Sequence, residues 1–208
     1  MRAFIAVCSG VLFLCSSSFT SVYGLEQKQS SGSDADIKSC LSAAKKALGP
    51  TAEVLKCGKL TGREGLEAVA ALRIRRLKQT PENVAVSRLV VLRRSRSGWK
   101  KELNVHREIT NSAGYVGIDF IDDSSEYHGY YVSFSDHRSD DTPAFVMYLS
   151  EIEPNGDPEW PVQIAWNPAV QRFQEYAGDR DPEGFRPELK NPSHKNLKDC
   201  GGCRNPRR

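Results

Sequence analysis

Hydrophobic residues recur along this chain at two different spacings, and the change between them separates one helix from a series of strands. From residue 37 to 48 the apolar positions stand three or four apart, which is the spacing of one face of an α-helix. Ser33 or Asp34 can cap the start of this segment, and Gly49-Pro50 ends it. The pattern predicts one amphipathic helix over about 34–48, whose apolar face needs a sheet to pack against.

Beyond residue 50, apolar and polar positions alternate, which is the pattern of half-buried β-strands. Clusters of Gly, Pro, Asn, Asp and Ser separate the alternating segments and predict turns. The segments expected to form strands are 52–57, 66–74, 84–92, 99–105, 115–121, 127–134, 144–152, 162–166 and 170–176. The alanines of segment 66–74 leave a helix as a competing interpretation there.

Eight or nine consecutive strands without intervening helices favour an antiparallel meander. We therefore expect a mainly β protein with a minor α+β character. Its one N-terminal helix should pack on an antiparallel meander that closes as a sandwich or partial barrel. Residues 25–33 are polar, and residues 178–208 are rich in Pro, Asp, Asn and Lys. We expect a single domain over 34–177, between a flexible N-terminal tail and an extended or disordered C-terminal tail.

Residues 1–24 show the succession of features that defines a secretory signal peptide. A positive residue precedes an uncharged apolar segment, and Val22-Tyr23-Gly24 supplies the small residues that signal peptidase requires. The apolar segment is too short to be a membrane span, and the large Leu14 before Cys15 argues against lipid anchoring. We predict cleavage near Gly24 and a secreted protein, extracellular or periplasmic, with no transmembrane segment in the mature chain.

The charge of the chain is small overall but unevenly distributed. The formal net charge of +3 argues against a dedicated nucleic-acid binder. Segment 63–107 carries twelve Lys or Arg and four Glu, whereas segment 119–159 carries eleven acids and one Arg. We expect strands of the two segments to lie side by side and to pair their opposite charges. Two separate binding faces are the alternative.

Four cysteines remain after the predicted cleavage, and a secreted protein uses them mainly for disulfides. Cys40 and Cys57 come within disulfide reach if the helix folds back on the first strand. Cys200 and Cys203 form a Cys-x-x-Cys pair that would close as a structural disulfide or serve as a redox pair. With His194, the same pair would provide three ligands of a zinc site.

A cluster of acids is a second candidate for chemistry. Its members are Asp119, Asp122, Asp123 and Glu126. Such oxygen-rich clusters suit Ca²⁺, and Asp122 with Glu126 could form the acid/base pair of a hydrolase. The spacing does not match a calcium-binding loop, and solvated turns are the simpler interpretation.

Aromatic residues provide a candidate ligand surface. If Tyr130 and Phe134 face the core, the alternation of a strand places Tyr131 on the opposite face. We expect Tyr131 to be exposed there, and with the neighbouring His128 it would form a surface for a partner.

No catalytic or cofactor-binding motif with the required spacing occurs in the sequence, and no cofactor is expected. The preferred function is therefore a secreted or periplasmic, non-catalytic β-domain that binds a protein or glycan ligand or belongs to the cell envelope. The alternative is an extracytoplasmic enzyme. It would be a thiol–disulfide oxidoreductase using Cys200 and Cys203, or a hydrolase using acids of 119–126.

Overall fold

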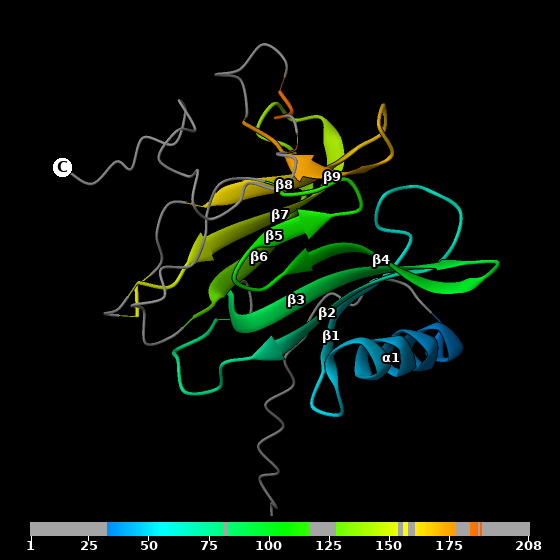
Figure 1. Ribbon diagram of the computed structural model, residues 1–208, viewed down its shortest axis with the longest axis horizontal. Coiled ribbons are helices and arrows are strands. Elements are labelled where there is room, and N and C mark those ends of the chain that lie inside the picture. Colours follow the sequence, from blue (N-terminus) through cyan, green and yellow to red (C-terminus); the bar gives the residue numbers. More distant parts are fainter. Residues whose placement is uncertain are drawn as a thin grey trace, which may run out of the picture.

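The computed structural model describes residues 33–80, 83–116, 128–153, 156–157, 161–177, 184–186 and 188. In this part of the chain one helix precedes nine strands (Figure 1). The elements are α1 (Asp34–Leu48), β1 (Glu53–Gly58), β2 (Glu67–Arg73), β3 (Val84–Ser95), β4 (Gly98–Val105), β5 (Ile109–Asn111), β6 (Tyr130–His137), β7 (Pro143–Glu151), β8 (Val162–Asn167) and β9 (Arg172–Glu175). The predicted order of a helix followed by antiparallel strands is confirmed, and the alanine-rich segment is a strand.

The bounds of α1 follow from its capping residues. The hydroxyl of Ser33 accepts a hydrogen bond from the backbone N–H of Asp36, and the Asp36 carboxylate accepts one from the N–H of Ser33. This reciprocal pair satisfies N–H groups that the first helical turn leaves without partners. Gly49 ends the helix at a φ of 101°, a conformation that glycine adopts without the steric cost of a side chain.

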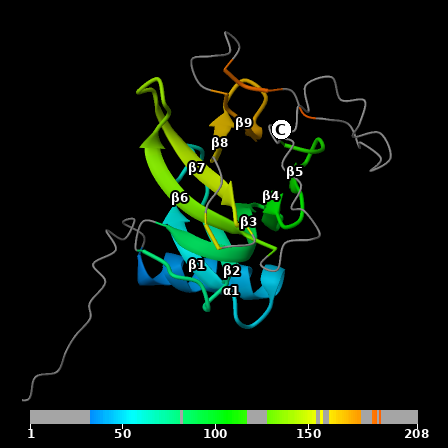
Figure 2. The same ribbon diagram turned by 90° about the vertical axis from the view of Figure 1, so that its left-hand side faces the viewer.

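All nine strands belong to one antiparallel sheet with the order β1-β2-β3-β6-β7-β8-β9, and β4 and β5 branch from it at β3. Along one edge of β3, Val84 to Val86 pair with β6, whereas Leu89 to Ser95 pair with β4. The sheet therefore forks at Ser87 and Arg88. Figure 2 shows the sheet curling away from α1 towards β8 and β9. The curled sheet is not closed into a barrel.

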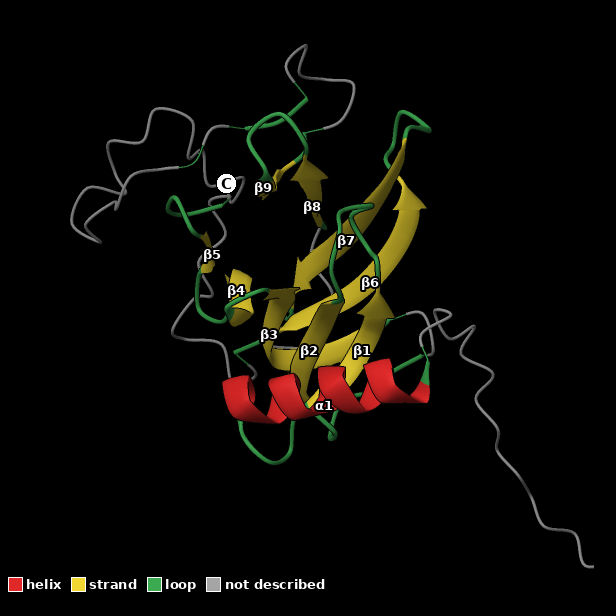
Figure 3. Cartoon of the chain, turned by 90° about the vertical axis from the view of Figure 1, so that its right-hand side faces the viewer, coloured by secondary structure: helices red, strands yellow, loops and turns green. Residues whose placement is uncertain are grey.

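The core occupies both faces of this curled sheet. Every strand contributes side chains to the main cluster on the inner face, from Leu55 of β1 to Phe173 of β9. On the outer face α1 lies across β1, β2 and β3 (Figure 3). Ala68 and Ala70 of β2 pack against α1, and their small side chains allow the helix to approach the sheet closely. Within the described residues, no helix has the length and apolar character needed to cross a membrane.

Four cations of the basic segment do not pair as the sequence suggested. They bind acids of their own half of the chain: Arg63 and Arg93 bind Glu102, and Arg73 and Arg75 bind Glu53. The expected pairing with segment 119–159 is wrong for these residues. The reason is that β3 and β6 share three residue pairs, which join Val and Ala side chains to Val and Tyr.

Candidate functional site

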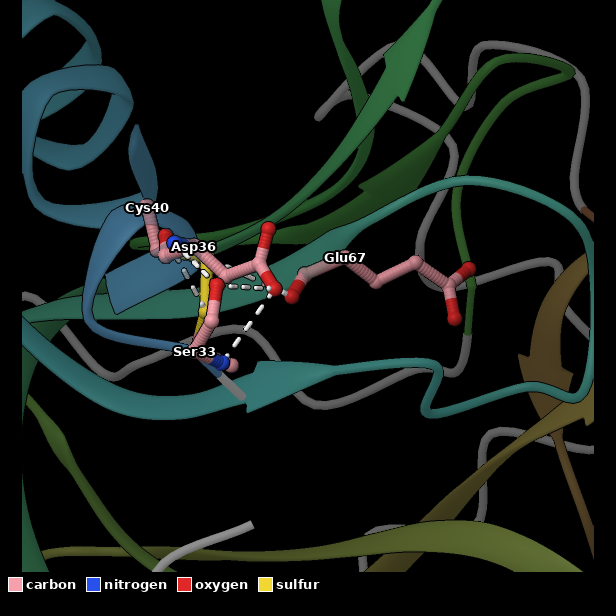
Figure 4. The surroundings of a disulfide bond; sticks show 5 residues. Ser33, Asp36, Cys40 and Glu67 are labelled. Carbon is pink, nitrogen blue, oxygen red and sulfur yellow. Dashed lines mark hydrogen bonds between the residues drawn. A yellow bond between two sulfur atoms is a disulfide. The ribbon is translucent and has the colours of Figure 1, made fainter. Parts of the chain in front are cut away.

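The predicted disulfide between Cys40 and Cys57 is present and ties α1 to β1. The two Cα atoms are 6.3 Å apart, and both side chains are buried. The Cys40 Sγ atom lies 3.7 Å from the carbonyl oxygen of Glu67, while the Glu67 side chain extends away from the disulfide (Figure 4). The burial of the disulfide indicates a structural bond, since readily reducible disulfides are strained or exposed.

The expectation that Tyr131 is exposed is wrong. Alternation does place it on the face opposite Tyr130, but its side chain is 7% exposed and packs with Ala85 and Ile152. Its hydroxyl donates a hydrogen bond to the carbonyl oxygen of Gly156 at 2.9 Å. That face is covered by segments from before β3 and after β7, which the strand's own pattern does not reveal. The neighbouring His128 is half-buried.

Several predicted residues lie outside the part of the chain that the structure describes. They are Asp119, Asp122, Asp123, Glu126, His194, Cys200 and Cys203, together with the signal segment 1–24. Among the described residues, no three His, Cys, Asp or Glu side chains lie close enough together to hold a metal ion.

The structure shows a cleft at one open end of the curled sheet, with a volume of about 440 Å³. That volume lies within the usual range for ligand sites, which is roughly 300–1,000 Å³. Three segments form the cleft: the loop after β1, the hairpin of β6 and β7, and the end of β8. Their lining residues are Lys59, Leu60, Thr61, Gly62, Asp136, Arg138, Thr142, Pro143, Ala144, Phe145, Trp166 and Pro168.

A buried carboxylate fixes the loop that forms the first wall. Glu67, which is 0% exposed, accepts hydrogen bonds from the backbone N–H of Thr61 at 2.7 Å and from its hydroxyl at 2.8 Å. Arg63 Nη2 donates to Oε1 of this carboxylate at 2.7 Å, the same oxygen that accepts from the Thr61 hydroxyl. Gly65 allows the loop to return to β2, since a Cβ there would lie 2.6 Å from the Arg94 carbonyl oxygen. The loop is held by a fully partnered buried charge.

The floor of the cleft is aromatic, and it is tied to the same network. The Arg63 guanidinium lies 3.4 Å from the ring centroid of Trp166, a cation–π contact. Trp166 packs edge-on against Phe173 at 5.3 Å between centroids. Phe145 stacks on Phe134 at 5.8 Å. Because Arg63 covers a face of Trp166, that face is not open for a ligand to stack on.

The wall opposite the loop is stabilised by a second set of paired charges. Arg138 binds Asp140 at 2.8 Å, and the hydroxyl of Tyr176 donates to the same carboxylate at 2.9 Å. Partial desolvation raises the pKa of Asp140, but the hydrogen bonds from Arg138, Thr142 and Tyr176 outweigh it and hold this pKa well below its usual value. Asp140 therefore stays ionised, and Arg138 stays neutralised, throughout the physiological pH range.

Two charges on the cleft remain. Lys59 stands on the loop after β1 and Asp136 on β6, and both are exposed. Among the described residues neither has an ion-pair partner, in contrast to Arg63, Glu67 and Arg138 around them. The cleft thus presents one cation, one anion and an apolar floor.

Sequence reasoning missed this cleft and its supporting network. The available signal was an acid, Glu67, at the start of an otherwise apolar strand, with Arg63 four residues earlier. This spacing indicates a local ion pair, but its burial depends on Trp166, which is far away in the sequence.

The chain matches no protein-family model, no curated protein and no solved structure.

Proposed function

We propose that the protein is a secreted, non-catalytic binding domain that docks an extended peptide segment of a partner protein in this cleft. The observation that carries the proposal is the contrast between paired and unpaired charges. The charges that shape the cleft are neutralised within the protein, whereas Lys59 and Asp136 face its opening without ion-pair partners. A ligand with both an acidic and a basic group would complement them.

The apolar lining favours a peptide over a glycan. Sugar-binding sites use exposed aromatic faces, whereas Trp166 is 6% exposed and Arg63 covers one of its faces. Leu60, Phe145 and Pro143 instead offer an apolar hollow of the kind that receives an aliphatic or aromatic side chain.

The lining residues also favour binding over catalysis. They include no histidine or cysteine, and Asp136 is their one carboxylate. A nucleophile with its base, or a pair of carboxylates, is what hydrolysis at such a site would require.

Secretion is the second part of the proposal. A buried disulfide between Cys40 and Cys57 is typical of proteins that fold in an oxidising compartment. The signal-like segment before residue 25 agrees with this. The partner is then a protein exposed outside the cytoplasm, in the extracellular space or the periplasm.

Selection from a random linear peptide library on the full mature protein tests the proposal. We expect the selected peptides to share an apolar residue flanked by one acidic and one basic residue. Lys59→Glu and Asp136→Lys should each weaken these peptides about tenfold, which corresponds to the loss of one charge contact of about 1.4 kcal/mol. The matched control is Arg96→Glu on the exposed β3–β4 hairpin, which should not change the affinity.

The double variant Lys59→Glu/Asp136→Lys provides the sharper measurement. It keeps the net charge and exchanges the two signs, so it should restore binding to peptides in which the order of acid and base is reversed. Peptides that bind the double variant and the native protein equally would contradict the proposal.

A further inference from the structure

The residues at the fork of the sheet form a second polar cluster, remote in sequence from the cleft loop. Pairing along one edge of β3 passes from β6 to β4 between residues 86 and 89, which leaves Ser87 and Arg88 at the fork. His106 directly follows the last residue of β4, and His128 stands two residues before the start of β6. Three separate segments thus bring Arg88, His106 and His128 together.

The charges that surround His106 are positive. Desolvation by partial burial lowers the pKa of His106 below its usual 6.5. The neighbouring charges of Arg88, Arg107 and His128 lower this pKa further. The strand register places these residues at the fork, since Leu89 pairs with Val105 and Val86 with Tyr130. Their common positive sign makes the fork attractive to an anion.

Two nitrogen atoms at the fork are buried without a hydrogen-bond partner. They are Nε of Arg88 and Nδ1 of His128. Leaving such atoms unpaired costs free energy, and an unpaired buried polar group in a native protein calls for a physical explanation. A bound oxyanion would provide one, because it offers several acceptors to the N–H groups of a guanidinium and of an imidazole.

The backbone holds His128 in an unusual conformation. Its φ is 29°, in a region that residues with a side chain rarely adopt. The next residue, Gly129, is pressed against the sheet: a Cβ there would lie 2.5 Å from the Val86 carbonyl oxygen and 2.6 Å from Ile74 Cδ1. This close packing fixes the backbone at residues 128 and 129 relative to β3.

The carboxylates on the elements around the fork are bound to other residues or stand at other positions than Arg88, His106 and His128. Glu53 binds Arg73 and Arg75, and Glu108 accepts a hydrogen bond from Tyr115. The remaining carboxylates on adjacent strand ends are those of Glu151, which pairs in register with Tyr130, and Glu153.

We propose that Arg88, His106 and His128 form a binding site for a tetrahedral oxyanion, phosphate or sulfate, which binds more tightly as the pH falls. Arg88 supplies the permanent charge and a planar set of donors that matches an oxyanion. The two histidines supply further donors, and the protonation of His106 makes the affinity depend on pH. The site recognises the oxyanion group, whether it is a free ion or an ester on a larger molecule.

Titration with sodium sulfate, followed by NMR of the histidine side chains, tests this site on the full mature protein. Sulfate stays a dianion at neutral and mildly acidic pH, so that any pH dependence comes from the protein. We expect sulfate to raise the pKa of His106 and to bind up to about tenfold more weakly for each pH unit above that pKa, because one proton is linked to binding. Sodium chloride at equal ionic strength is the control for screening.

Variants separate a site from general salt effects. Arg88→Gln should abolish the sulfate-specific change at His106, and His106→Gln, at an exposed position, should abolish the pH dependence while the fold is kept. The matched control Arg96→Gln should behave as the native protein. An equal response to chloride and sulfate, or an unchanged response in Arg88→Gln with native circular dichroism, would overturn the proposal.

A sulfated disaccharide distinguishes the two sources of the oxyanion. If it binds at least tenfold more tightly than inorganic sulfate at the same pH, and Arg88→Gln removes this binding, the site takes a sulfate ester. If inorganic sulfate binds as tightly as the disaccharide, the site takes the free ion. Failure of both probes would contradict the site and would leave the peptide cleft unaffected, since the cleft uses different residues.

Discussion

The ladder between β2 and β3 carries a polar cluster towards each end, and the two clusters are opposites. Glu67 pairs in register with Arg93 at one end, and Leu72 pairs with Arg88 towards the other. At the first end the buried carboxylate of Glu67 has every partner it needs from Thr61 and Arg63. At the second end, buried nitrogens of Arg88 and His128 have none among the protein's own groups.

The difference separates polar groups that build the structure from those that are available to a ligand. A buried charge whose hydrogen bonds are complete fixes the chain around it, as Glu67 fixes the loop of the cleft. A buried donor without a partner costs free energy in the empty protein, and this cost is removed when a ligand binds. Removing the Glu67 charge should therefore lower the stability, whereas removing the Arg88 charge should raise it.

Glu67→Ala should have the largest effect on stability. It leaves the Arg63 guanidinium, whose side chain is 14% exposed, without its main counter-charge. Breaking a buried ion pair by removing one partner costs about 3–5 kcal/mol. Urea unfolding followed by tryptophan fluorescence should show this loss, and Glu64→Ala, at an exposed neighbouring position, is the control. A loss below about 1 kcal/mol would mean that the network does not hold the loop.

Cys40→Ser/Cys57→Ser should have the next largest effect. The disulfide closes a loop with a sequence separation of 17 residues, for which the chain-entropy account predicts about 3 kcal/mol. Because the Cys40 sulfur touches the backbone of Glu67, we also expect faster amide hydrogen exchange at the start of β2. Unchanged exchange there, with the stability loss present, would show that the two features act independently.

Arg88→Met should change stability in the opposite direction. The substitution replaces a half-buried cation, whose Nε has no partner, by an apolar side chain that reaches about as far as Nε. Without sulfate we expect the free energy of unfolding to rise by about 1 kcal/mol. With sulfate the stability advantage of the variant should shrink or reverse. The reason is that sulfate binding raises the free energy of unfolding of the native protein but not that of the variant. A destabilised variant in the absence of sulfate would contradict the comparison.

The smallest effect concerns pH. His106 has a lowered pKa in the folded state, so below about its usual pKa of 6.5 the unfolded chain binds more protons than the folded one. Stability should therefore fall as the pH drops through this range towards the lowered pKa. His106→Gln should flatten the decline, and His137→Gln, on the exposed end of β6, should not. Thermal unfolding at a series of pH values measures both slopes.

The local pattern of the sequence was sufficient to predict most helices and strands, but it did not predict which strands pair with each other. The bounds of α1 follow from Ser33 and Gly49 and were predictable, as was the disulfide that its position implies. Strand β5 was missed because its three residues are too few to show an alternation. The fork was not predictable either, since it depends on which strand pairs with each part of β3.

The candidate sites depended even more on contacts between distant segments. Glu67 occupies a polar position in an alternating pattern, and its complete burial follows from the loop and from Trp166 above Arg63. Tyr131 was placed on the correct face, but segments elsewhere in the chain cover that face. Alternation predicts which side of a strand a residue occupies, and tertiary packing decides whether that side is open.

The proposed function is tested most directly by mapping a selected peptide onto the isotope-labelled protein by NMR. We expect chemical-shift changes at residues 59–62, at Asp136, at residues 142–145 and at the indole N–H of Trp166, which together line the cleft. The signals of α1 and of the β3–β4 hairpin should remain unchanged. Shifts centred on α1 or on that hairpin, with the cleft residues unmoved, would contradict the account.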